Sequence, residues 1–202
     1  MSRSATISGE ADTSRGDGPG VTAMRTTPDD LLRIPMSWDD YLALDDPRPS
    51  EYYGGAQVIQ GSPTFRHQKV IQRLERHLGD GLADGTDVIG GWAWSPDGSR
   101  EALKPDLMVI TQDGEDDHLT VPPLLVVEVV SSNRKDDYVA KTQRYAQWGA
   151  PTYWIVDPRD RVIVTFRNDG GTFVESARHT DGAVVLAYGD VEVPVDLDAL
   201  FA

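Results

Sequence analysis

The sequence predicts an α/β fold in which a mixed β-sheet is flanked by helices. One observation is a series of short apolar segments with the composition of strands, at Asp87–Trp94, Pro105–Ile110, Leu124–Ser131 and Thr152–Asp157. Another is a helical segment from about Lys135 to Trp148 between the last two of these strands. Strands interspersed with helices indicate a mixed sheet with helices packed on it.

Length and composition indicate a single domain. The chain has 202 residues, enough for one domain with its own core. Residues 1–25 are rich in Gly, Ser, Thr and Asp, which predicts a disordered tail and leaves 26–202 as the domain. There is no cysteine, no run of about 18 apolar residues and no apolar stretch typical of a secretory signal. We therefore expect a cytoplasmic protein without a membrane span.

The remaining elements follow from caps and turns. A short helix is predicted at Trp38–Leu44 with Ser37 as its N-cap, and a strand at Gln57–Gln60. Arg161–Arg167 is predicted to form a hairpin with the strand before it, and further short strands follow from residue 170. Leu197–Phe201 predicts a last helical turn.

A second helix carries the main concentration of positive charge. Ser62 and Pro63 indicate its start, and it runs to about Leu78 and ends at Gly79. Four basic residues share one arc of this helix: Arg66, Lys69, Arg73 and Arg76. They form either a solvated face or a surface that contacts substrate phosphates. The net charge of -14 disfavours non-specific binding to nucleic acid, but carboxylates that hold a cation also make a chain acidic.

The segment from Leu124 to Val130 has the pattern of a strand buried on both faces, and Glu128 interrupts it. A buried carboxylate costs several kcal/mol unless a cation or strong donors compensate it. Glu128 therefore predicts either a structural ion pair or protonated acid, or a functional site. Asp106 stands at the start of the preceding apolar strand, and the two acids together would form an oxygen-rich site for Mg²⁺ or Mn²⁺.

Lys141 lies at the edge of the apolar arc of the helix that follows Glu128. Its ammonium is placed to orient an attacking water or to stabilise charge on a phosphoryl oxygen. The alternative is a lysine whose stem packs on aromatic side chains. With the main-chain carbonyl of Val129 as a further metal ligand, these residues predict a metal-dependent phosphodiesterase site.

The combination resembles a known family. Asp106 in Pro-Asp-Leu, Glu128 in Val-Glu-Val-Val-Ser and Lys141 in the next helix are similar to the Uma-type restriction endonucleases, over about residues 36–165. The resemblance implies the PD-(D/E)xK nuclease fold, a restriction-endonuclease-like mixed sheet of four strands flanked by helices, here with extra β-hairpins. It implies a divalent metal at the two acids, Lys141 in place of the lysine missing at Val130, and Glu51 as an additional acid.

We therefore expect a Mg²⁺- or Mn²⁺-dependent endonuclease that cleaves DNA, with Arg66, Lys69, Arg73 and Arg76 along the substrate. One alternative is a catalytically inactive nuclease-fold module that binds nucleic acid or protein, and another is hydrolysis of RNA or of a nucleotide. His67 is either a core residue or a residue of the site. Trp92 and Trp94 either belong to the core or stack on bases of the substrate. A homodimer would suit a double-strand cutter.

Overall fold

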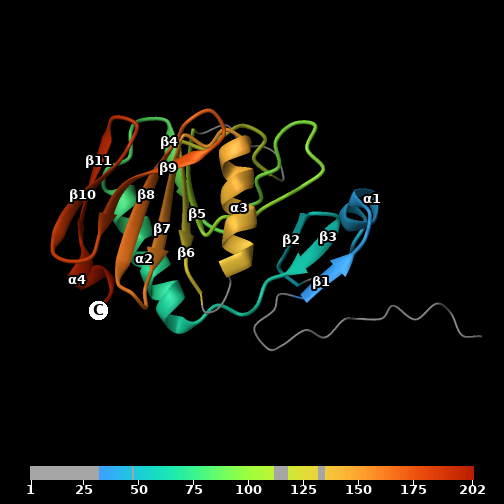
Figure 1. The fold of residues 1–202 in the computed structure, drawn as a ribbon, viewed down its shortest axis with the longest axis horizontal. Helices are drawn as coiled ribbons and strands as arrows, with labels where there is room; N and C mark the ends of the chain where they lie inside the picture. The colour runs from blue at the N-terminus through green and yellow to red at the C-terminus, as the bar shows by residue number, and fades with distance from the viewer. Residues whose placement is uncertain (1–31, 47, 112–117, 132–134) are drawn as a thin grey trace, which may run out of the picture.

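The computed structural model describes residues 32–46, 48–111, 118–131 and 135–202, and Figure 1 shows their arrangement. The predicted tail, residues 1–25, lies outside this part of the chain. The central element is a six-stranded mixed sheet in the order β4-β5-β6-β7-β8-β9. Its strands are β4 (Thr86–Ile89), β5 (Leu107–Thr111), β6 (Leu125–Val129), β7 (Thr152–Asp157), β8 (Val162–Asn168) and β9 (Phe173–His179).

The sheet is mixed because β6 and β7 are parallel, whereas each other neighbouring pair is antiparallel. The parallel pair is joined by α3 (Lys135–Gln147), as parallel strands need a crossover. The four predicted strands lie side by side as β4 to β7, and the predicted hairpin extends the sheet through β8. The expected fold class is confirmed.

Two smaller sheets stand beside the central one. An antiparallel sheet in the order β1-β3-β2 comprises β1 (Leu32–Pro35), β2 (Ser50–Tyr53) and β3 (Ala56–Ile59), with α1 (Trp38–Leu42) beside it. We call β1, β2, β3 and α1 the N-terminal lobe. At the other end, shown on the left of Figure 1, β10 (Ala183–Tyr188) pairs with β11 (Val191–Asp196), which leads into α4 (Leu197–Leu200).

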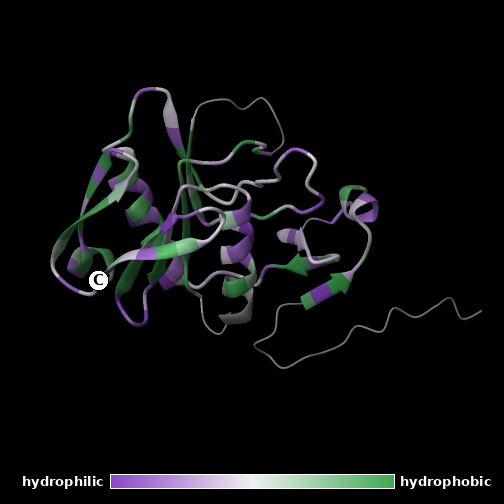
Figure 2. Ribbon diagram, turned by 45° about the horizontal axis from the view of Figure 1, so that its top comes forward, coloured by the Kyte–Doolittle hydropathy of each residue, from purple (hydrophilic) through white to green (hydrophobic). Residues whose placement is uncertain are grey.

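The core has two parts, one on each face of the central sheet. On one face α2 (Phe65–Gly79) buries Val70, Leu74 and Leu78 against the sheet, the β10–β11 pair and α4. On the other face Tyr145 of α3 packs with aromatic residues of the sheet and with Tyr53 of the N-terminal lobe. Figure 2 shows the hydrophobic colouring of the strands between these two layers. Because side chains of a strand alternate between faces, β6 contributes to both parts.

Three predicted boundaries need correction. The α2 N-cap is Thr64, not Ser62, because the Thr64 hydroxyl accepts the His67 N–H. The first predicted strand ends at Ile89, not at Trp94, since Gly90 and Gly91 follow and the chain bends there. The first helix ends at Leu42 rather than Leu44. Ser37 caps that helix as predicted, and its side chain accepts the Asp40 N–H.

Candidate active site

Asp106 immediately precedes β5, where the chain enters the sheet beside β6. Leu107 pairs with Val127 in the antiparallel register, so one step back along β5 brings Asp106 beside Glu128. The Asp106 Oδ2 accepts the backbone N–H of Val129 at 2.8 Å and lies 3.2 Å from His67 Nε2. The Asp106 side chain is 22% exposed and is therefore open to a ligand.

Glu128 lies in β6 and is buried. Its Oε1 accepts the Tyr145 hydroxyl at 2.7 Å and lies 3.6 Å from the ammonium of Lys141. Burial raises the pKa of Glu128 to about 8, against the opposing effect of Lys141 and with added repulsion from Asp106 and Glu51. Without a further cation Glu128 is therefore largely protonated at neutral pH, and a bound cation would favour its ionised form.

Lys141 reaches the same place from α3. Its Nζ lies 2.8 Å from Glu51 Oε2 as well as near Glu128, and the Lys141 side chain is only 6% exposed. The second Glu51 oxygen accepts the backbone N–H of Lys104 at 2.7 Å. Glu51 comes from β2, so the N-terminal lobe contributes a carboxylate that holds the lysine.

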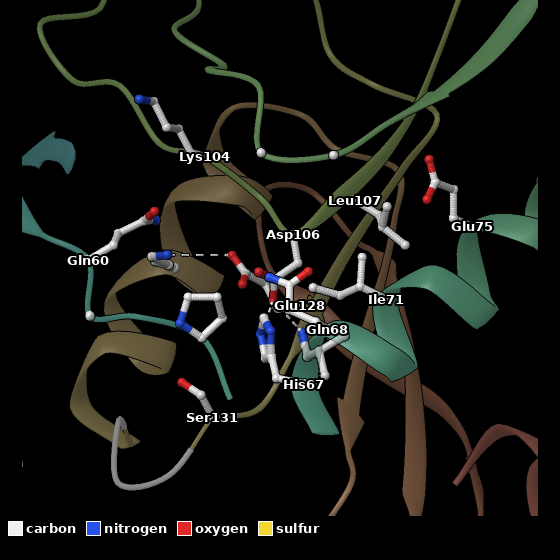
Figure 3. A pocket seen from close by; sticks show the side chains of 16 residues that line it. Gln60, His67, Gln68, Ile71, Glu75, Lys104, Asp106, Leu107, Glu128 and Ser131 are labelled. Atoms are coloured by element: carbon white, nitrogen blue, oxygen red, sulfur yellow. Dashed lines mark hydrogen bonds and ion pairs between the residues drawn. The ribbon is translucent and has the colours of Figure 1, made fainter. Parts of the chain in front are cut away.

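The acids and the lysine line one cavity of about 440 Å³, which Figure 3 shows from close by. Asp106, Glu128, Val129 and Lys141 all line it, so four of the predicted site residues come together. Figure 3 shows His67 and Gln68 of α2 beside the acids and Lys104 at the rim. Glu51 does not line the cavity, but its carboxylate forms an ion pair with Lys141, which does.

The predicted basic stripe lies elsewhere. Arg66, Lys69 and Arg73 line a different cavity, and the α2 residues that face the acids are instead His67, Gln68, Ile71 and Glu75. Arg76 is exposed and lines neither cavity. The structure does not bring the stripe together with the acids, and its contact with substrate stays a prediction.

Several site residues were not found from the sequence. Lys104 and Gln68 line the cavity, but no spacing rule singles out a lysine before a proline or an exposed helical glutamine. Helical periodicity gives Tyr145 no more than an apolar position on α3, although its hydroxyl donates a hydrogen bond to Glu128. Burial and the nearby carboxylates of Glu128 and Glu51 raise the pKa of Tyr145 well above its ordinary value, so this phenol acts as a donor.

Two residues that were left open are now placed. His67 is buried and contacts Asp106, while its Nδ1 has no hydrogen-bond partner among the described residues. Trp94 is fully buried and stacks on Tyr145 with ring centroids 5.9 Å apart, so it belongs to the core and does not offer a face to a base.

The two acids fit a hard divalent cation. Oδ1 of Asp106 and Oε2 of Glu128 accept no hydrogen bond from the described residues, which leaves one oxygen of each carboxylate for a ligand. Among these residues no group of three or more His, Cys, Asp or Glu side chains is placed to hold a metal. Magnesium is commonly held by one or two carboxylates and several waters, so a two-carboxylate site is sufficient.

A mixed sheet that brings an aspartate, a glutamate and a helical lysine to one cavity defines a protein of the restriction-endonuclease-like class. The sequence model of the Uma2 family, described as "Putative restriction endonuclease", matches residues 38–192. The chain therefore belongs to the Uma2 family, a family of nucleases.

Solved structures agree with this fold. A "putative nuclease belonging to DUF820" from Anabaena variabilis is similar with a TM-score of 0.70 and 15% sequence identity. The similarity covers 83% of this chain and 98% of the other. No curated protein sequence matches the chain. In the described part of the chain, no helix is long and apolar enough to cross a membrane.

Proposed function

We propose that the protein is a Mg²⁺- or Mn²⁺-dependent endonuclease that hydrolyses phosphodiester bonds in DNA. The observation that carries the proposal is the convergence of Asp106 and Glu128 on one cavity, with one oxygen of each carboxylate accepting no hydrogen bond from the described residues. Membership of a nuclease family supports the reaction class. The choice of DNA and of a divalent metal is our proposal.

Asp106 and Glu128 would hold the metal, with the main-chain carbonyl of Val129 as a further ligand. When bound, such an ion polarises the scissile phosphate and lowers the pKa of a water that it coordinates. His67 and the Val129 N–H fix the Asp106 carboxylate through Oδ2 and so leave Oδ1 toward the ion.

Lys141 supplies the positive charge that belongs to the chain itself. Its ammonium, held 2.8 Å from Glu51, is available to stabilise charge that develops on the phosphoryl oxygens. Both Glu51 oxygens already accept hydrogen bonds or an ion pair from the protein. We therefore assign Glu51 to positioning Lys141 rather than to a second ion. Lys104 at the rim is placed to contact a phosphate of the incoming strand.

The test is cleavage of plasmid and of single-stranded DNA in Mg²⁺, Mn²⁺ or EDTA. We expect Asp106→Asn and Glu128→Gln each to lower kcat at least about 100-fold, the usual scale for loss of one electrostatic group in a site. The matched control is Asp87→Asn, an exposed aspartate in the neighbouring strand β4, which should cleave like the wild type.

Calorimetry with Mn²⁺ separates a metal role from a purely structural one. Both site variants should lose Mn²⁺ binding and keep their fold, since each substitution preserves the size of the side chain. Cleavage that survives in either site variant would remove the proposed site. A wild-type protein that binds DNA but cleaves none in either metal would favour the inactive binding module.

A further inference from the structure

A second cavity, of about 230 Å³, lies on the opposite side of α2 from the acid site. We call it the α2 groove, and it is lined by Phe65, Arg66, Lys69, Val70, Arg73, Phe201 and Ala202. At 100° per residue, the α2 residues of the two cavities fall on different arcs of the helix. The cavities are nevertheless close, because Phe65 and Arg66 are followed directly by His67 and Gln68, which line the acid site.

Phe65 is the most exposed large hydrophobic residue in the described part of the chain, with 78% of its surface accessible. It is the first residue of α2, and Lys69 Nζ lies 5.4 Å from the centre of its ring. An exposed phenylalanine gains none of the roughly 1.5–3 kcal/mol that burial of the side chain would contribute to folding. The ring is therefore available to a ligand that stacks on it.

The α2 groove is positively charged. Arg66, Lys69 and Arg73 line it, and no carboxylate side chain of the described residues lines it or forms an ion pair with these three. Arg73 donates to the main-chain oxygen of Leu200 at 2.8 Å and to an oxygen of Ala202, the last residue of the sequence, at 2.7 Å. Arg66 and Lys69 therefore supply most of the uncompensated positive charge. In a chain with a net charge of -14, this surface complements a polyanion.

We propose that the α2 groove binds unpaired single-stranded nucleic acid, with one base stacked on Phe65 and phosphates on Arg66, Lys69 and Arg73. Aromatic stacking combined with a basic groove is the chemistry of single-strand binding. Bases in a duplex are stacked on one another and cannot meet the ring. The nucleic-acid strand would pass around the N-terminal end of α2 to the acid site. This path rests on the proposed function of that site.

Binding is measured by fluorescence anisotropy with labelled oligothymidylate of about ten nucleotides, within the span that such grooves cover. EDTA is present throughout, so that cleavage does not contribute. We expect Phe65→Ala to weaken binding about 5- to 100-fold, the effect of losing one stacked base, and Phe65→Trp to preserve it. Both variants should keep the thermal stability of the wild type, because the ring is exposed.

The matched control is Val139→Ala, a similarly exposed apolar residue on α3, which should leave the affinity unchanged. Arg66→Ala should weaken binding and reduce the slope of log affinity against log salt by about 0.7, since the slope for single strands follows the number of neutralised phosphates. An oligouridylate of equal length distinguishes RNA from DNA as the source of the strand.

Unchanged affinity of Phe65→Ala for both oligonucleotides would overturn the proposal. An equal loss on a blunt duplex would overturn the assignment to single strands. Phe65-dependent binding to vesicles rich in phosphatidylserine, without oligonucleotide binding, would assign the groove to a membrane surface instead. The binding assay contains no metal, so it is independent of cleavage. If Phe65→Ala does not weaken binding but the wild type cleaves DNA, only the proposal for the α2 groove is wrong. If Phe65→Ala weakens binding but the wild type cleaves no DNA, only the proposed function of the acid site is wrong.

Discussion

The two faces of the central sheet bury different kinds of side chain. On the α2 face, the side chains packed against the sheet are mostly aliphatic, with Leu74 and Leu78 fully buried. The α3 face carries the buried charges Glu51, Glu128 and Lys141 among aromatic rings. Buried ion pairs seldom stabilise a fold more than apolar side chains of the same volume would. The comparison indicates that the α2 face provides stability and that the α3 face sacrifices some of it for a charged site.

The largest expected effect comes from removing the cation of the charged face. Lys141→Met leaves Glu51 and Glu128 buried without their ammonium, and we expect the free energy of unfolding to fall by about 3–5 kcal/mol, as for other broken buried pairs. The measurement is urea denaturation at pH 7.5 without metal. The control is Arg76→Met, an exposed residue of the basic stripe, which should change stability by less than about 0.5 kcal/mol.

A second substitution identifies the cause of that loss. The double variant Lys141→Met with Glu51→Gln removes one of the two stranded acids and should regain part of the stability. A Lys141→Met protein as stable as the wild type would mean that Glu51, like Glu128, is largely neutral at pH 7.5, and the contrast between the faces would then disappear.

The next effect concerns pH and comes from Glu128 alone. Burial, partly opposed by Lys141, raises the pKa of Glu128 to about 8 in the folded protein, above its ordinary value near 4.5. Between these values the folded state holds a proton that the unfolded state releases. The proton that Glu128 holds in the folded state therefore contributes to the free energy of unfolding. This contribution is fully present below about pH 4.5 and is lost as the pH rises to 8.

The Glu128→Gln variant without metal should not show this pH-dependent loss of stability, because glutamine does not titrate. Between pH 5 and 8 the wild type should lose on the order of 3–4 kcal/mol relative to the variant. Thermal melts at closely spaced pH values in EDTA provide the measurement, with Leu74→Ala as a control that lowers stability equally at each pH. Parallel curves for wild type and Glu128→Gln would show that Glu128 titrates normally.

The sequence predicted the acids because they violate a local rule. Glu128 interrupts an apolar strand, and such an interruption has few explanations. Lys141 followed from helical periodicity, since a wheel gives its position at the edge of the apolar arc. The segments that form the central strands followed from their apolar composition, and the hairpin partner of the last one from the turn between them.

Contacts between distant segments were not predictable in the same way. The pair Glu51 and Lys141 depends on how the N-terminal lobe docks, and no local pattern contains that information. A helical wheel also showed that Arg66 and Lys69 share a face of α2 but not which cavity that face borders. The start of α2 was missed because Ser62 and Thr64 are both good capping residues, and only the geometry distinguishes them.

The smallest expected effect tests whether the aromatic rings of the α3 face only fill space. Tyr145 and Tyr153 are both fully buried and their ring centroids lie 5.7 Å apart, but only the Tyr145 hydroxyl donates to Glu128. Tyr145→Phe should cost about 1–2 kcal/mol of stability and weaken Mn²⁺ binding about tenfold, because a partner that orients a metal ligand is lost. Tyr153→Phe removes a hydroxyl from the same cluster and should leave Mn²⁺ affinity unchanged. Equal Mn²⁺ affinities for the two variants in calorimetry would show that Glu128 is oriented by Lys141 and the strand alone.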